Sequence, residues 1–203
     1  MVELQKDTEH KILQAAEEEF IQNGMAGARM QEIADRAGIN KALLHYYYRS
    51  KDKLFMSVFK MALSKFIPKV EKIINSEETL FDKIRLFVHE YGQIIMKNQF
   101  IPLFVMHELR RNPDMLAGTV ISTGVNPEVF IKQVEKAKSE GLIRDINPRD
   151  IIVNMLSLII FPVAGKPMIQ RILFNNDQKA YQQYLKQRLE EIPDFIINSI
   201  KKH

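Results

Sequence analysis

The feature that most constrains the fold is a helical period that runs through almost the whole chain. Apolar residues recur three and four positions apart, and no stretch shows the sustained alternation of a half-buried strand. The sequence therefore predicts an all-α protein. Turn and breaker residues separate the periodic segments and predict helices at about 8–23, 30–37, 40–47, 51–66, 80–97, 101–111, 128–140, 149–161 and 179–201.

Capping and breaking residues define several helix ends. Asn40 and Ser50 are good N-cap residues for the helices that follow them. Gly24 suits the left-handed position just after a helix, so we expect the first helix to end there. Pro68 and Pro193 lack a backbone N–H, and we expect the first to interrupt or kink its helix and the second to bend or restart the last one.

Composition narrows the class of protein. The 203 residues include no cysteine, which excludes disulfides, thiolate metal sites and cysteine nucleophiles. The 29 Lys and Arg against 25 Asp and Glu give a net charge of +4, which permits a polyanionic partner without demanding one. We expect the three glutamates at 17–19 to form a solvated helix face.

Two further patterns concern location. The N-terminus has neither a basic region nor an apolar run, so we expect no secretory signal. The longest apolar stretch, 151–165, is interrupted by Asn154, Ser157 and Pro162 and is shorter than the roughly 20 residues of a membrane span. We therefore expect a cytoplasmic protein with no membrane partner.

Residues 30–48, MQEIADRAGINKALLHYYY, predict a helix-turn-helix, because two short helices flank a turn of three residues. Ala34 is small enough for the two helices to approach closely, and Gly38 can take the positive φ of a tight turn. The residues expected in a shared core are Ile33, Ala37, Ile39 and Leu44, and those left outside are Asn40, Lys41, Leu43, His45 and Tyr46. This geometry places the second helix in a DNA major groove.

Extended further, the string IADRAGINKALLHYYYRSKDKLF resembles the TetR (tetracycline-repressor) family of transcriptional regulators, whose members look like I-A-x-x-A-G-V-S-x-G-x-L-Y-x-x-F-x-x-K-x-x-L. The agreeing positions are Ile33, Ala34, Ala37, Gly38, Leu44, Lys51 and Leu54. Tyr48 stands at the place of a Phe that packs in the family, so we expect it in the core. The family's frequent Ser or Thr at the start of the second helix is replaced by Arg29 and Met30, and its recognition-helix Tyr is His45.

The resemblance implies a helix-turn-helix DNA-binding domain at 1–51 and a ligand-binding and dimerisation helical bundle at 52–203. Base-edge contacts are implied for Gln31, Lys41, Ala42 and Leu43, and backbone contacts for Arg29, Asn40, His45, Tyr46, Tyr47 and Lys51. Gln can pair with adenine, Lys can donate to guanine, and apolar side chains can touch the thymine methyl. The local cations are Arg29, Arg36, Lys41, Arg49 and Lys51, and they predict a modest dependence of binding on salt.

The resemblance also implies a small-molecule pocket inside the bundle. The apolar stripes of the bundle first of all indicate an ordinary core, and they also fit a ligand site. The candidate lining residues are Phe87, Tyr91, Phe104, His107, Met155 and Phe161. The family's dimer interface falls on the apolar run 151–161 and the last helix. The last helix is richer in apolar residues than one monomer requires, and those residues are Tyr181, Leu185, Ile192, Ile196 and Ile200.

Sequence motifs of catalysis are absent. The chain has no G-x-S-x-G elbow, no G-x-x-x-x-G-K loop and no dinucleotide fingerprint, and neither His-Glu pair has a second His at metalloprotease spacing. We expect no enzyme activity, cofactor or metal. The sequence predicts a homodimeric regulator, a repressor that a small molecule releases from its double-stranded DNA operator. A ligand-responsive activator remains an alternative, as does a helical small-molecule-binding protein or enzyme whose N-terminal unit is not functional.

Overall fold

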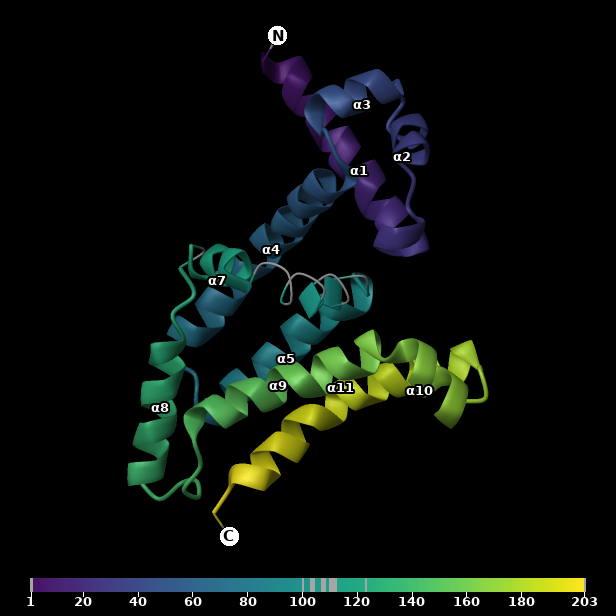
Figure 1. Ribbon diagram of the computed structural model, residues 1–203. Helices are drawn as coiled ribbons and strands as arrows, with labels where there is room; N and C mark the ends of the chain where they lie inside the picture. Colours follow the sequence, from purple (N-terminus) through teal and green to yellow (C-terminus); the bar gives the residue numbers. More distant parts are fainter. Residues whose placement is uncertain are drawn as a thin grey trace. The chain divides into compact units, whose positions relative to one another are not determined.

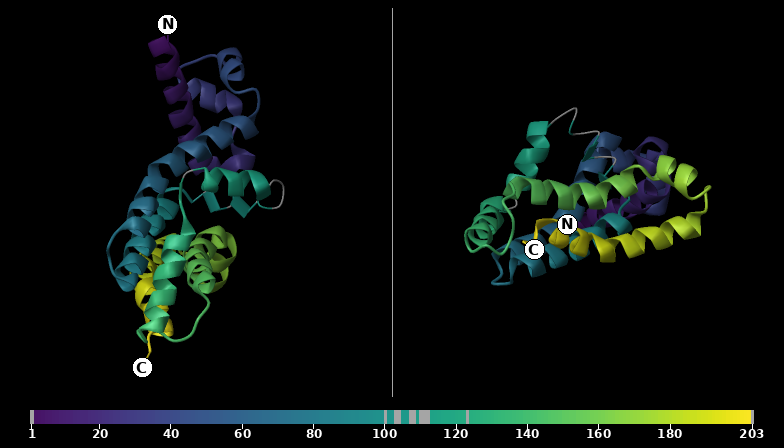
Figure 2. Two further views of the ribbon diagram at one scale, coloured as in Figure 1. Left: turned by 90° about the vertical axis from the view of Figure 1, so that its left-hand side faces the viewer. Right: turned by 90° about the horizontal axis from the view of Figure 1, so that it is seen from below.

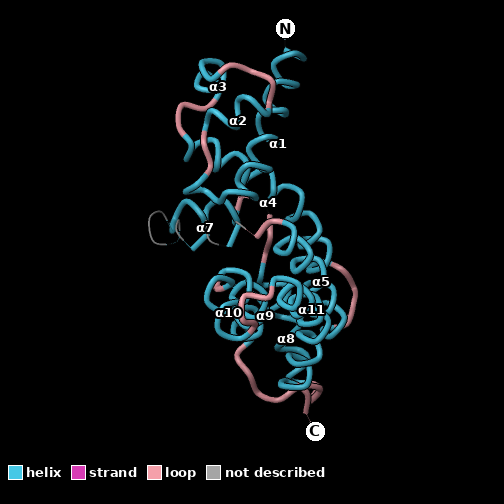
Figure 3. The backbone as a smooth tube through the Cα atoms, turned by 90° about the vertical axis from the view of Figure 1, so that its right-hand side faces the viewer, coloured by secondary structure: helices cyan, strands magenta, loops and turns pink. Residues whose placement is uncertain are grey.

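The structure is a computed structural model that describes residues 2–99, 101–102, 105–106, 109, 113–122 and 124–202. Within these ranges the chain forms helices and no strand, which confirms the all-α prediction (Figure 3). The helices are α1 (Val2–Gly27), α2 (Met30–Arg36), α3 (Lys41–Tyr47), α4 (Lys51–Asn75), α5 (Leu80–Lys97), α7 (Pro113–Ile121), α8 (Pro127–Ser139), α9 (Pro148–Ala164), α10 (Lys166–Leu173) and α11 (Gln178–Ile200) (Figure 1). The chain divides into two compact units, Met1–Lys65 and Phe66–His203.

The first unit packs α1, α2, α3 and the beginning of α4 around one apolar core. Ile12 and Phe20 of α1 are fully buried, and the Phe20 ring lies 4.6 Å from that of Phe55 in α4. α1 begins at Val2, earlier than predicted, since the sequence contains no breaker before residue 8. Gly24 has a φ of 64° and breaks the helical conformation where the sequence predicts an end, and one more helical turn follows it.

The second unit is built on α5, α9 and α11, against which α8 and α10 pack. α9 and α11 run side by side in opposite directions and are joined through α10 at one end (Figures 1 and 2). Their facing sides bury the aliphatic stripes that the helical period predicts. Gly92 allows α5 to approach α11 closely, because a Cβ at that position would lie 2.6 Å from a methyl carbon of Leu189.

Several sequence-based expectations differ from the structure. α4 continues through Pro68 to Asn75, beyond the predicted end near residue 66. α11 runs through Pro193 to Ile200, close to the predicted range of 179–201. The cost of a proline within a helix is a lost hydrogen bond and a local clash, and the burial of each helix's apolar face offsets it. The predicted helix at 101–111 lies largely outside the described residues. No single described helix is long and apolar enough to cross a membrane. Among the described helices only α9 and α10, taken together, reach that length and apolar content, and the pair is bent by 72°.

Candidate functional site

The turn between α2 and α3 has the tight geometry that its sequence predicts. The amide of Gly38 donates to the Asp35 carbonyl at 3.1 Å, and the amide of Ile39 donates to the Ala34 carbonyl at 3.0 Å. Gly38 has a φ of 68°, a left-handed conformation that costs a residue with a Cβ about 1 kcal/mol or more. Ala34 and Leu44 are fully buried, so the two short helices are held at close range.

α3 begins with a side-chain cap and presents a mixed polar and apolar surface. The Asn40 Oδ1 accepts from the Leu43 amide at 2.8 Å, which confirms the predicted N-cap. Among the residues that follow, Lys41 is exposed, Leu43 is 37% exposed and Tyr46 is 73% exposed. Of the other predicted contact residues on α3, Ala42 and His45 are exposed and Tyr47 is half-buried.

α2 lacks a side-chain cap of its own, as the replacement of Ser or Thr by Arg29 suggests. The Arg29 amide instead donates to Oε1 of Glu19 at 3.4 Å, while the Arg29 side chain is exposed. Gln31 is exposed, but its side-chain Nε2 donates to Oδ1 of Asp35 at 2.8 Å. A base contact by Gln31 therefore requires that this bond within α2 opens.

The predicted solvated face of α1 is wrong at Glu19, which is 2% exposed. Glu19 lies on the same helical stripe as Ile12, Ala16 and Phe20, and this period was the signal for its burial. Its carboxylate accepts from Asn23 Nδ2 at 2.9 Å and from an Nη of Arg36 at 3.3 Å, besides the Arg29 amide. Glu19 thus attaches both ends of α2 to α1, a role that sequence reasoning missed.

Two of the cations predicted near the DNA are engaged within the unit. Arg36 bonds Glu18 at 3.2 Å and Gln22 at 3.2 Å in addition to Glu19. The Lys51 Nζ donates to the carbonyls of Ala26 and Ala28, at 3.2 and 3.1 Å, so it caps the last turn of α1. The remaining cations of the cluster, which are exposed and have no partner among the described side chains, are Arg29, Lys41 and Arg49.

Tyr48 packs in the core, as its place in the family pattern predicts. It is 7% exposed, and its hydroxyl donates to Oε1 of Glu9 at 3.0 Å. The pKa of Tyr48 lies well above its usual value. Burial is the main cause, and the hydrogen bond to the Glu9 carboxylate is the second. The bond joins the end of α3 to the N-terminal half of α1, so α1 supports both helices of the helix-turn-helix.

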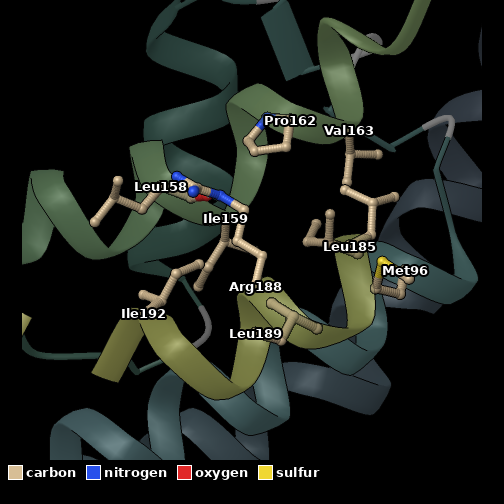
Figure 4. A pocket seen from close by; sticks show the side chains of 11 residues that line it. Met96, Leu158, Ile159, Pro162, Val163, Leu185, Arg188, Leu189 and Ile192 are labelled. Atoms are coloured by element: carbon tan, nitrogen blue, oxygen red, sulfur yellow. The ribbon is translucent and has the colours of Figure 1, made fainter. Parts of the chain in front are cut away.

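The second unit contains a small cavity between α5, α9 and α11 (Figure 4). Its volume is about 10 Å³, roughly the space that one water needs. The lining includes Met96, Leu158 and Leu185, and every lining residue except Arg188 is apolar. Arg188 is a member of the cavity that sequence reasoning missed, because its position within α11 does not reveal which helices face it.

The predicted pocket residues do not gather at this cavity. Phe87 stacks on Tyr91 with ring centres 5.4 Å apart, and burial raises the pKa of Tyr91 to about 12. Met155 is 4% exposed, whereas Phe161 is 59% exposed and so lies on the outer side of α9. None of these four lines the cavity. The other two predicted residues, Phe104 and His107, lie outside the described residues.

The apolar residues of α11 that were expected to be surplus are buried inside this unit. Their exposed fractions are 3% or less, because they face the core that α11 shares with α5 and α9; they are Tyr181, Leu185, Ile192, Ile196 and Ile200. The large apolar side chains left exposed on α9 and α11 are Val153, Phe161 and Phe195. The core of one protomer therefore accounts for these five residues, and the expectation that they exceed what a monomer requires is wrong.

Comparisons with known proteins agree with the fold and with the first unit. Residues 12–58 match the family described as bacterial regulatory proteins, tetR family. The Fatty acid metabolism regulator protein of Bacillus subtilis is 24% identical over 102 residues, which are 50% of this chain and 53% of that protein. The HTH-type transcriptional repressor NicS of Pseudomonas putida is 25% identical over 162 residues, 75% of this chain and 72% of NicS.

A solved structure extends the likeness to both units. The transcriptional regulator FadR from Bacillus subtilis, solved in complex with stearoyl-CoA, superposes with a TM-score of 0.61 and 18% identity over 90% of this chain and 96% of that one. At this identity the likeness shows the fold alone. Residues 12–58, which hold the helix-turn-helix, therefore belong to the tetR family of bacterial regulatory proteins, whose members are DNA-binding transcriptional regulators.

Proposed function

We propose that this protein is a homodimeric transcriptional repressor that a small molecule, bound in the second unit, releases from its operator. The observation that carries the proposal is α3. It is capped by Asn40, follows a tight turn at Gly38, and exposes Lys41, Leu43 and Tyr46. A helix of this kind inserts its first residues into the major groove.

Each exposed side chain has a partner on DNA that suits its chemistry. Lys41 donates to guanine O6 or N7, and Leu43 packs against a thymine methyl. The hydroxyl of Tyr46 and the guanidinium groups of Arg29 and Arg49 bind phosphate oxygens, which position the protein without reading sequence. Arg49, which is exposed, is an addition to the contacts that the family pattern implies.

The contact assignment is tested with DNA selected from a random pool. Lys41→Ala and Tyr46→Phe should weaken binding in a gel-shift assay while the oligomeric state is unchanged. Lys60→Ala is the matched control, since Lys60 is an exposed lysine of α4 in the same unit. Full affinity in both of the first two variants would overturn the assignment of α3 as the reading helix.

A dimer explains how seven-residue helices can give operator specificity. Two copies of α3 would enter successive major grooves, with half-sites about one helical turn apart or a multiple of it. We assign the pairing surface to the exposed apolar side chains Val153, Phe161 and Phe195 of α9 and α11. Phe161→Glu combined with Phe195→Glu should give a monomer in analytical ultracentrifugation, and an unchanged dimer would contradict this surface.

Repression is favoured over activation by the relative NicS, which is named as a repressor. A reporter gene placed behind the selected operator distinguishes the two. Deletion of the gene for this protein should raise reporter expression if the protein is a repressor and lower it if the protein is an activator. The alternative of a helical enzyme with a merely structural first unit predicts no specific DNA binding and no fall of affinity with salt. A ligand can release the operator only by its differential affinity for the two states of the dimer.

A further inference from the structure

Arg188 is a cation placed between aliphatic side chains of the cavity and the ring of Tyr184, whose centre lies 6.0 Å from its Cζ. It lies on α11, is half-buried, and lines the cavity between α5, α9 and α11. Its side chain extends from α11 toward α9 and ends beside Leu158 (Figure 4). A guanidinium carries five N–H donors. Here one of them, Nε, donates to the Leu158 carbonyl at 3.4 Å, and no carboxylate among the described residues lies within 4.0 Å of the group.

The acceptor that Arg188 uses is a consequence of Pro162. In a regular helix the Leu158 carbonyl accepts from the amide four residues later, and a proline there has no N–H to donate. Arg188 occupies this free carbonyl, but the bond is long and the acceptor is neutral. A half-buried positive charge in an apolar lining is stabilised much better by an anion, which forms short charge-assisted hydrogen bonds. The site therefore lacks the negative partner that its chemistry favours.

The surroundings of Arg188 suit an apolar body attached to such an anion. Gly92 contributes no side chain, and the methyl carbons of Leu189 cover it. Met96 is unbranched and can change rotamer at small cost. The cavity of about 10 Å³ is smaller than an alkyl chain, so entry of a ligand requires the Met96 and Leu189 side chains to move.

We propose that Arg188 binds the carboxylate of an amphiphilic monoanion whose unbranched apolar chain enters between α5, α9 and α11. The site thus assigns the ligand class as a medium-chain or long-chain carboxylate. The role of this ligand as the effector rests on the proposed function, whereas its binding to the second unit does not.

The test uses the full-length protein and isothermal titration calorimetry with decanoate and with 1-decanol, both below their aggregation concentrations. The two probes share an apolar chain and differ in charge. We expect decanoate to bind about tenfold or more tightly than the alcohol, the range of one charge-assisted contact. Equal affinity for both probes, or no binding of decanoate, would overturn the proposal, and this comparison needs no variant.

Variants then locate the contact. Arg188→Gln should lose the preference for decanoate, and Arg188→Lys, which keeps the charge, should retain part of it. Arg171→Gln is the matched control, because Arg171 is an exposed arginine of α10 outside the cavity. An Arg188→Gln protein that still prefers decanoate by the same factor would overturn the assignment of Arg188.

A gel shift with the selected operator separates this inference from the proposed function. Decanoate should release the operator from the native protein and from the Arg171→Gln variant, but not from Arg188→Gln. Failure of decanoate to bind, with operator binding intact, overturns only the ligand class. Binding of decanoate with no operator binding overturns the proposed function and leaves the ligand site standing.

Discussion

The slope of DNA affinity against salt concentration reports how many positive charges the protein places against DNA phosphates. The structure predicts that this number is small. Of the five cations around the helix-turn-helix, Arg36 is bonded to α1 side chains, and Lys51 is bonded to the carbonyls of Ala26 and Ala28 at the end of α1. The other three are exposed, so a dimer would bring six charges to its operator. The logarithm of the binding constant then falls with the logarithm of salt concentration with a slope of about −5, whereas all ten charges would give about −9.

Two substitutions with the same change in formal charge test this reasoning. Arg49→Gln removes an exposed charge from each protomer, and the slope should become shallower by about 2. Arg36→Gln removes a charge that Glu18 and Glu19 already compensate, so it should leave the slope unchanged. It should lower the affinity by a similar factor at every salt concentration, because α2 loses an attachment to α1.

The measurement is fluorescence anisotropy of a labelled operator duplex in KCl from about 50 to 300 mM, the range over which such slopes are linear. Circular dichroism at the same temperature establishes that both variants are folded. If Arg36→Gln reduces the slope as much as Arg49→Gln does, Arg36 contacts DNA directly and the role given to Glu19 is refuted. If neither variant changes the slope, the exposed cations do not face the phosphates.

Three further outcomes are expected in urea unfolding of the full chain. Glu19→Gln should lower the free energy of unfolding by about 1–3 kcal/mol, because this buried carboxylate accepts several hydrogen bonds. Glu18→Gln, at an exposed position, should lower it by less than about 1 kcal/mol. Above pH 10 the free energy of unfolding should fall, because Tyr48 keeps its proton in the folded state beyond its ordinary pKa of 10.0 whereas the unfolded chain releases it. Tyr48→Phe should remove this contribution, which is about 1.4 kcal/mol of unfolding free energy per pH unit. Gly92→Ala should cost about 1–3 kcal/mol by overpacking against a leucine of α11, whereas Gly118→Ala, with no atom within 4 Å of its Cβ, should be neutral or stabilising.

The helix-turn-helix could be predicted because its determinants are local. The N-caps at Asn40 and Ser50 accept from amides three residues ahead, so the residue type and its position are sufficient. The same holds for the positive φ at Gly38, which depends on four consecutive residues. The burial of Leu44 and Tyr48 follows from spacing within one short helix and its C-cap.

The partners of charged side chains could not be predicted in the same way. Lys51 and Arg36 are cations beside a reading helix, and their residue types fit phosphate contacts equally well. Their actual partners lie on α1 or directly after it, 14 to 25 positions away, and only the packing of α1 against α2 and α4 brings them together. Glu19 was predictable as buried from its helical stripe, but a run of three glutamates obscured that stripe.

The last turn of α9 shows how a sequence signal can be present while its consequence depends on another helix. Pro162 interrupts the apolar run and leaves the Leu158 carbonyl without a backbone donor. Its own carbonyl lies in the final turn of the helix, where no later amide completes the pattern. Tyr181 donates to the Pro162 carbonyl and Arg188 to that of Leu158, both from α11. Seven residues separate these two donors, which is two turns, so both lie on the face of α11 toward α9. That face therefore combines a fully buried tyrosine with a half-buried arginine. The arginine has one long hydrogen bond and a ring contact with Tyr184 but no anionic partner among the described residues, so it is the group to which we assign the carboxylate.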